Sequence, residues 1–532
     1  MNHDERPARP MRRIPPTVIP GTAVRRIGAR ILDPTTSARV KGQAPEPTAY
    51  VSDVLVVSEL EGPDFDARYG ALEEAAKEAG YAVQPVPDDE LLGFARENDL
   101  YGEFTRVGST TVRLVPLSRN SAPADAWEIL QSARARGAKG VGLAHVMTAS
   151  GWSDGIGWSD GIGWSDGIGW SDGIGWSDGI GWSDGISGGP SGRFPVVWSA
   201  GLPDRTTKEG PVVVTLDTGL GEHPWFSNGV ERHPGGVGPS LGVTFPAGTD
   251  PEKDGVTIDL VNGRLDRLAG HGTFIAGVIR QHCPDARILS VPVMWGDGVA
   301  DEVDVLSALT GLYLRQQRAV RDGNPQEAVD VITLSLGYRH ETPGAFDDEE
   351  ALFRLLRGVA ELGVTIVAAV GNDASDVKFF PAAYASHVTT GAPMVSVGAL
   401  NPDHRTVSVY SNTGTWVRTY AAATSVVSTM PTTFNASRRG ELLQQANPTA
   451  LPSVPTRGAV DLDDYSGGFG LWSGTSFAAP ALAGDIAQAI LQGIVRGAGE
   501  ERSVDVGQRS SRARAAVTSV LEAAAKALEE KR

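Results

Sequence analysis

The sequence of 532 residues predicts an α/β protein whose main domain follows a smaller α+β module. Two observations indicate the main domain. Residues 212–217 (VVVTLD) and 364–372 (VTIVAAVGN) are typical of buried strands that end in a polar side chain. Residues 274–279 (FIAGVI) and 477–498 are typical of apolar helices that begin beside glycine-containing motifs. Buried strands that alternate with helices favour a mostly parallel central sheet.

A third observation indicates the smaller module, at residues 49–150. Strand-type and helix-type segments follow each other there in the order β-α-β-β-α-β, which is the ferredoxin-like order. The expected strands are 51–60, 82–86, 110–117 and 140–146, and the expected helices are 65–80, 122–135 and a polar, mainly helical 88–98. No sharp motif marks the module, so an unrelated sensor or docking domain of the same common fold would share this order.

Three motifs place an acid, a histidine and a serine in one chain order. Asp217 ends the first apolar strand, in VVVTLDTG. His271 lies in GHGTFIAG and Ser476 in GTSFAAP, each at the start of an expected helix. A serine hydroxyl is a poor nucleophile, so it needs a neighbouring base, and that base needs a third group to hold its tautomer.

These motifs resemble those of the subtilisin-like (subtilase) serine proteases, and the resemblance covers roughly residues 195–495. It implies that Ser476 is the nucleophile, His271 the general acid and base, and Asp217 the carboxylate that orients the imidazole. It also implies a three-layer domain at residues 193–500 that hydrolyses protein or peptide substrates through an acyl-enzyme.

Two further segments extend the resemblance. Asn372 matches the subtilase asparagine that donates a hydrogen bond to the oxyanion. Residues 329–337 (VDVITLSLG) match the family strand that pairs with extended substrate. The resemblance assigns substrate binding to four residues: Ser335, Leu336, Gly337 and Gly371. The two glycines would leave room for the first substrate side chain.

Some motifs allow other interpretations. The tripeptide Asp-Thr-Gly also occurs in strand-ending turns and in aspartic proteases, in which two such carboxylates share a proton. Only one copy occurs here, and an aspartic protease would leave the histidine and serine motifs unexplained. Asp373 would favour a basic or polar first substrate side chain if it lined the specificity pocket, or it would be a solvated acid.

Two irregular segments depart from the common subtilase pattern. Residues 222–268, rich in Gly, Pro and Asp, are expected to form an enlarged surface loop near the substrate cleft. Residues 432–464 are expected to form a second insertion. Beyond Ser476, we expect a helix with Pro480 in its first turn. Within 501–532 we expect an alanine-rich helix that packs on the main domain, with packing on a partner helix as the alternative.

Composition limits the partners. A net charge of −17 argues against a nucleic-acid partner, which would require a basic face, and against an anionic membrane. The single cysteine, Cys283, excludes an intramolecular disulfide and is either a small buried residue or a redox-sensitive thiol. The chemistry requires no cofactor, and no ligand cluster assigns a metal site, although subtilases often carry structural calcium.

The N-terminal segment and the linker region carry distinct signals. Residues 1–48 are rich in Arg and Pro and are expected to be disordered. They contain no 7–15-residue apolar run, and no stretch of 18 apolar residues follows, so the sequence predicts a cytoplasmic protein. Residues 151–186 are six identical copies of GWSDGI. We interpret 151–192 as a tether, with a small solenoid or a calcium-binding array as alternatives.

The sequence therefore predicts a serine endopeptidase whose module at 49–150 resembles subtilase propeptides in position and strand order. Such a module would inhibit the enzyme through its C-terminal end, or would bind a regulatory protein partner. Two alternatives are an idle scaffold that presents its cleft to a partner, and a partner-activated component of a signalling or defence assembly. The intact set of four catalytic-type residues argues against the scaffold, because an idle site has no chemical need for all four.

Overall fold

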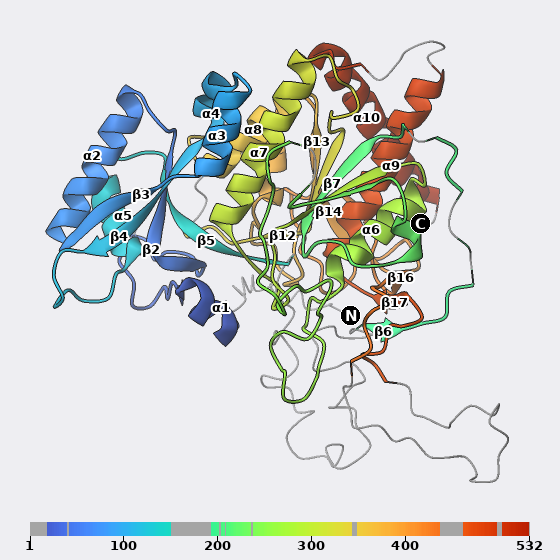
Figure 1. The fold of residues 1–532 in the computed structure, drawn as a ribbon, viewed down its shortest axis with the longest axis horizontal. Helices are drawn as coiled ribbons and strands as arrows, with labels where there is room; N and C mark the ends of the chain where they lie inside the picture. Colours follow the sequence, from blue (N-terminus) through green and yellow to red (C-terminus); the bar gives the residue numbers. More distant parts are fainter. Residues whose placement is uncertain are drawn as a thin grey trace, which may run out of the picture.

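The computed structural model describes residues 19–39, 42–149, 193–199, 201, 204–207, 209–235, 238–342, 348–436, 461–496 and 503–530. The expected repeat tether lies outside these residues, as does most of the expected second insertion. Figure 1 shows a small module on the left, built from the first part of the chain, against a larger domain.

A seven-stranded sheet lies at the centre of the larger domain, and all of its strands are parallel. Its order is β15-β14-β13-β11-β7-β9-β8. The strands are β7 (Val212–Asp217), β8 (Val230–Arg232), β9 (Arg287–Pro292), β11 (Val331–Leu334), β13 (Thr365–Ala369), β14 (Met394–Leu400) and β15 (Thr419–Ala422). β7, β11, β13 and β14 are buried along their whole length, as near-continuous apolar strands of a parallel sheet must be.

Helices cover both faces of this sheet (Figure 1), which confirms the predicted three-layer α/β domain. One face carries α6 (His271–His282), α9 (Thr475–Arg496) and α10 (Val506–Glu530). The face toward the module carries α7 (Glu302–Arg321) and α8 (Ala351–Glu361). A small antiparallel sheet of β16 (Val426–Thr429), β17 (Phe469–Trp472) and β6 (Phe194–Pro195) lies beside α6. Among the described residues, no helix is long and apolar enough to cross a membrane.

The module contains an antiparallel sheet of order β5-β2-β4-β3, with α2 and α5 packed together on one face. Its elements are β2 (Ala49–Ser58), α2 (Pro63–Glu78), β3 (Tyr81–Val86), α3 (Asp89–Glu97), α4 (Tyr101–Val107), β4 (Ser109–Pro116), α5 (Ala126–Ala135) and β5 (Val141–Ala149). All the expected strands and helices are present. Only α4 was not predicted, because it is short and no side chain caps it. The relation to ferredoxin-like propeptides stays a prediction.

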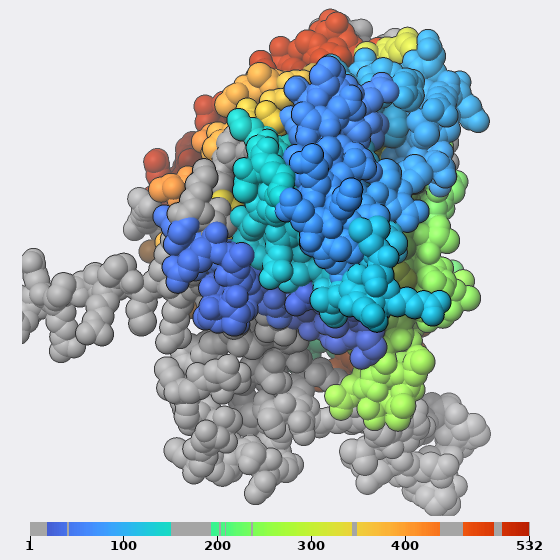
Figure 2. Space-filling model, turned by 90° about the vertical axis from the view of Figure 1, so that its left-hand side faces the viewer, coloured from blue at the N-terminus to red at the C-terminus, as the bar shows by residue number. Residues whose placement is uncertain are grey.

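The sheet of the module is apolar on both faces. In β2, Leu55 and Val57 belong to the module's own core with α2 and α5, whereas Val54 and Val56 belong to the core of the larger domain. Successive side chains of a strand point to opposite faces, so this pattern requires cover on both sides. The hairpin of α3 and α4, together with α7 and α8, supplies the second cover. Figure 2 shows the module, in blue and cyan, spread over this side of the molecule.

The expectation of disorder for residues 1–48 is wrong for 19–39. Helix α1 (Gly21–Ile27) and strand β1 (Ala29–Ile31) are ordered, and β1 pairs antiparallel with β2. Arg26 forms an ion pair of 2.7 Å with the buried Asp297, and its guanidinium lies 4.5 Å from the ring centre of Trp295. Composition alone gave the wrong prediction, because this segment is held in place by contacts with residues far away in the sequence.

The expectation of a surface loop at 222–268 is only partly correct. This segment contains the short helix η1 (Pro224–Phe226) and β8, which adds an edge strand to the main sheet. It also carries Glu252, which is 3% exposed. By contrast, α10 packs on α9, and Arg509 forms an ion pair of 3.3 Å with Asp330, so the expected packing of this helix on the main domain is confirmed.

Candidate active site

Several predicted site residues lie at one edge of the main sheet. Asp217 ends β7, Ser335 follows β11, and Asn372 follows β13 by three residues. Since these strands are parallel neighbours, their carboxyl ends meet at the same edge. Helices α6 and α9, which pack against each other, begin at His271 and Thr475 there. The fold therefore brings together motifs that are far apart in the sequence.

Asp217 and His271 are in direct contact. The Nδ1 atom of His271 lies 2.7 Å from Oδ1 of Asp217, and both side chains are buried. The backbone N–H of Thr218 donates to the same carboxylate oxygen at 2.8 Å. A carboxylate at Nδ1 makes this nitrogen the donor and leaves Nε2 as the basic nitrogen. This is the tautomer that a general base requires.

Aromatic packing places the histidine against the turn that carries Ser476. The ring centroid of the His271 imidazole lies 5.4 Å from that of Phe477 and 5.3 Å from that of Trp472. Phe477 directly follows Ser476 in the first turn of α9. The structure thus brings the serine motif to the histidine motif.

The position of Pro480 in its helix differs from the prediction. Helix α9 begins at Thr475, so Pro480 lies in its second turn and not in the first. In a helix, the N–H at this position would bond the carbonyl of Ser476, but proline has no N–H. The hydroxyl of Ser335 donates to that carbonyl instead, at 2.8 Å. Ser335 therefore ties the end of β11 to the residue predicted as nucleophile.

The amide of Asn372 has a defined orientation. Its Oδ1 atom lies 2.9 Å from the backbone nitrogen of Thr475 and 2.9 Å from the Thr475 hydroxyl. Because a backbone N–H can only donate, the atom that faces it must be the carbonyl oxygen of the amide. The amide NH₂ group lies on the side of Gly474 and stays available as a donor.

The last strand of the module, β5, ends between two short strands of the larger domain. It runs antiparallel between β10 (Val299–Asp301) and β12 (Leu336–Gly337), with Ala149 opposite Leu336. An extended chain that adds to strand edges in this way is held by backbone hydrogen bonds. Ser335 and Leu336 therefore lie beside the end of a bound extended chain.

The subtilase family model matches residues 208–494. This chain belongs to the subtilase family. Among curated relatives, a thermophilic serine proteinase of Bacillus sp. (strain AK1) is 30% identical over 197 residues, which cover 34% of this chain and 42% of that protein. An extracellular protease of Xanthomonas campestris pv. campestris is 26% identical over 260 residues, which cover 43% of this chain and 39% of that protein. The matches span less than half the length of these relatives.

Solved structures of related enzymes also match. Fervidolysin from Fervidobacterium pennivorans, a keratinolytic enzyme related to subtilisin, gives a TM-score of 0.43 at 15% identity over 84% of this chain and 56% of that chain. A cold adapted subtilisin-like serine proteinase gives 0.32 at 21% identity over 54% of this chain and 78% of that chain.

In this subtilase, the ring of Phe379 lies close to both glycines that are predicted to bind substrate. A Cβ atom on Gly337 would lie 2.6 Å from the Phe379 ring, and one on Gly371 would lie 3.3 Å from it. Phe379 itself is buried. The motifs alone did not indicate this ring, and the role of the two glycines in substrate binding stays a prediction.

Asp373 is not a solvated acid. Its carboxylate is buried and forms an ion pair of 2.8 Å with Arg339. Its backbone N–H donates to Oδ1 of Asn412 at 2.9 Å. An arginine therefore balances the charge of Asp373, which the sequence did not indicate.

A buried cluster of ionisable side chains joins the module to the subtilase domain, and sequence reasoning missed it. His145 of β5 lies between Glu302, 2.7 Å from Nδ1, and Glu341, 2.9 Å from Nε2. The ring of Tyr338 stacks on this imidazole at 4.0 Å. Burial by itself would lower the pKa of His145, but the charges and hydrogen bonds of the two glutamates outweigh it and raise this pKa to about 10.

The neighbouring groups of the cluster are also paired. Burial would raise the pKa of Glu341, but His340, His145 and Arg134 outweigh it and hold this pKa well below its usual range. His340 contacts Glu350 by a short hydrogen bond. The interface thus combines buried positive and negative charges, which favour a tightly docked module.

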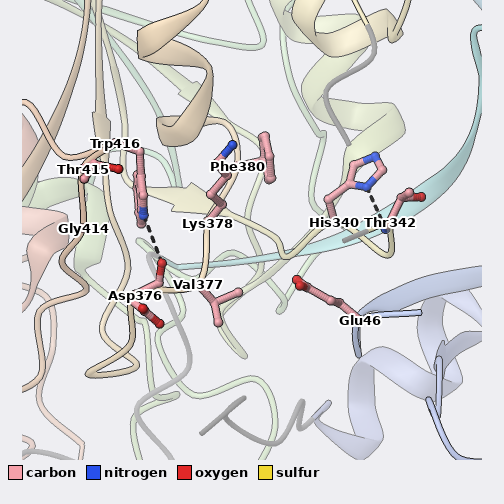
Figure 3. Close-up of a pocket in the computed structure, with 10 residues that line it drawn as sticks. All are labelled: Glu46, His340, Thr342, Asp376, Val377, Lys378, Phe380, Gly414, Thr415 and Trp416. Carbon is pink, nitrogen blue, oxygen red and sulfur yellow. Dashed lines mark hydrogen bonds between the residues drawn. The ribbon is translucent and has the colours of Figure 1, made fainter. Parts of the chain in front are cut away.

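A cavity of about 330 Å³ lies beside this cluster (Figure 3). Glu46, from the segment before β2, and His340 line one side, and Asp376, Lys378 and Trp416 line the other. The indole N–H of Trp416 donates to the backbone oxygen of Asp376 at 3.2 Å. The predicted catalytic residues do not line this cavity, so it is separate from the candidate active site. In the described part of the chain, no three His, Cys, Asp or Glu side chains are close enough to hold a metal ion.

Cys283 is a buried residue at the end of α6. Burial raises the pKa of its thiol to about 12, so very little thiolate forms near neutral pH. We expect the native protein to resist a thiol reagent such as DTNB at pH 8 and to release one equivalent of thiol after unfolding in guanidinium chloride. Native labelling as fast as that of free cysteine would contradict the buried position.

Proposed function

We propose that this subtilase is a serine endopeptidase in which Ser476, His271 and Asp217 form the catalytic triad. Ser476 attacks the peptide carbonyl while Nε2 of His271 accepts its proton. Asp217 stabilises the resulting imidazolium, which then protonates the leaving amine, and water releases the acyl group. The contact of 2.7 Å between Asp217 and Nδ1 of His271 carries this proposal. Replacement of Ser476, combined with labelling by a fluorophosphonate, tests it.

We further propose that Asn372 and the backbone N–H of Ser476 hold the oxyanion. The oxygen of the Asn372 amide is occupied by Thr475, which leaves the NH₂ group to donate. The start of α9 adds the positive end of a helix dipole at the same place. Donors of this kind stabilise charge that develops in the transition state.

We propose that the module, residues 49–149, inhibits the enzyme by occupying the substrate groove. Strand β5 supplies a middle strand between β10 and β12, where an extended substrate would bind. Its end at Ala149 lies opposite Leu336, next to the serine that contacts the Ser476 carbonyl. A regulatory partner would activate the enzyme by displacing β5 from β10 and β12. Cleavage of the module would activate it by removing the same strand.

We propose that the enzyme prefers a small side chain at the residue before the scissile bond, because the ring of Phe379 lies close to both Gly337 and Gly371. Phe379→Ala should raise kcat/KM for substrates with Phe at that position by about 10–100-fold, since burial of such a side chain is worth about 1.5–3 kcal/mol. Substrates with Ala there serve as the control and should change little. A wild-type enzyme that already prefers Phe over Ala would contradict the proposal.

A further inference from the structure

Glu252 is a buried carboxylate that the proposed reaction does not use. It lies in the segment 222–268, which separates the aspartate and histidine motifs. Its Oε1 atom accepts the backbone N–H of Gly272 at 2.9 Å, and its Oε2 atom accepts the hydroxyl of Thr273 at 2.5 Å. The hydroxyl of Thr218 donates to Oε1 through a further short bond. In these contacts, the described side chain of Glu252 is paired with neutral donors and with no cation.

All three donors are next to residues of the proposed triad. Thr218 directly follows Asp217, while Gly272 and Thr273 are the first two residues after His271. The first N–H groups of a helix have no partner within the helix, and no side chain of α6 caps them. Glu252 supplies that acceptor from a segment outside the helix. The N–H of Gly272 also bonds the Thr218 hydroxyl at 2.8 Å, which closes the network.

We propose that Glu252 is a positioning residue that holds the end of β7 against the start of α6 and thereby fixes Asp217 relative to His271. This inference rests on the proposed protease function. Glu252 acts through Thr218, Gly272 and Thr273, and not on the substrate. A shift of about 1 Å in a catalytic group can cost about 10²-fold in rate, so a carboxylate that joins the two supporting segments has a large effect on catalysis.

The charge of Glu252 gives this role a pH signature. Burial raises the pKa of Glu252 to about 7; hydrogen bonds from Thr218 and Thr273 oppose the rise, and the charges of Asp217 and Asp250 add to it. These groups face it from β7, from α6 and from its own loop. The carboxylate therefore ionises in the range where a histidine base also titrates. An ionised Glu252 places a second negative charge beside Asp217, and this charge favours a positive charge on the groups that the network supports.

Two substitutions in the full chain test the proposal. Glu252→Ala removes the bridge and should lower kcat about 10–100-fold while KM changes less than about twofold, since the residue does not line the groove. Glu252→Gln keeps the shape but cannot ionise. It should keep a plateau rate close to that of the wild type and move the acidic limb of the kcat/KM profile to lower pH by about 0.5 unit or more. Rates are divided by the concentration of sites titrated with a fluorophosphonate.

Glu222→Gln is the matched control, because Glu222 is an exposed glutamate in the same segment. Its kcat and pH profile should equal those of the wild type. If Glu252→Ala fails to fold, the pH profile of Glu252→Gln still decides the matter. A profile of Glu252→Gln that matches the wild type would overturn the proposal, as would a rise in KM at constant kcat in Glu252→Ala. Activity that survives Ser476→Ala would instead overturn the proposed function, so the two failures are distinguishable.

Discussion

Ser476→Ala will lower kcat by about 10⁶-fold, on the scale established for subtilisin itself. Without the hydroxyl, no acyl-enzyme can form, and only the oxyanion donors and substrate binding remain to accelerate attack by water. KM for a small peptide should change little, because the substitution leaves β10 and β12 unchanged. The measurement is hydrolysis of a chromogenic peptide by the purified full chain, together with intact mass after treatment with a fluorophosphonate.

Ser466→Ala provides the control for this substitution. Ser466 is an exposed serine in the loop before β17, ten residues before the predicted nucleophile. Wild type and Ser466→Ala should each take up one fluorophosphonate, and Ser476→Ala should take up none. Undiminished hydrolysis by Ser476→Ala would show that another residue carries the reaction. An adduct found only on a shortened chain would show that the module must be cleaved before the site opens.

His145→Ala should release the inhibition by the module. The imidazole joins β5 to Glu302 and Glu341, and its removal takes the imidazole partner from Glu302 and leaves Glu341 with only Arg134 and His340. Removal of one member of a buried ion pair costs about 3–5 kcal/mol, which corresponds to about 150–5,000-fold weaker docking. We therefore expect the initial rate of peptide hydrolysis by the full chain to rise strongly in this variant.

Arg113→Ala is the control for the module, because the side chain of Arg113 is 59% exposed on β4 and pairs with Asp53 instead of with a glutamate of the cluster. Its activity should match that of the wild type. Circular dichroism should show that both variants are folded. A folded His145→Ala variant with no more activity than the wild type would contradict a role of β5 in inhibition.

The same cluster makes the inhibition depend on pH in a defined direction. The pKa of His145 rises from 6.5 to about 10 in the docked module. A raised pKa means that the docked state binds the proton more tightly, so the contribution is complete below about pH 6.5 and declines as pH rises toward 10. Activity of the wild type relative to His145→Ala should therefore increase between pH 7 and pH 10.

The predicted catalytic residues could be found from the sequence because each lies in a short motif with its own chemical logic. Asp217 ends an apolar strand, and His271 and Ser476 begin apolar helices. The order of strands and helices in the module could also be predicted from the sequence, since periodicity and turn residues are local signals. The α/β class of the larger domain follows from the same kind of evidence.

Residues outside such motifs could not be found in this way. Glu252 is one acid among several in a segment rich in Asp, and only the fold shows that it bonds Gly272 and Thr273. Phe379 reads as an ordinary apolar residue until its ring is seen against Gly337. Order at Arg26 likewise depends on Asp297, which lies 271 residues further along the chain.

By itself, the sequence determined which motifs the chain carries and where each lies: an acid at the end of a strand, a histidine and a serine at the starts of helices, and an amide after a strand. Only the tertiary structure decided which distant segments meet. It placed β5 between β10 and β12, set His145 between two glutamates 157 and 196 residues away, and brought Phe379 close to Gly337. The physical reason is that burial and charge pairing depend on which distant segments meet, whereas motif and periodicity depend on near neighbours.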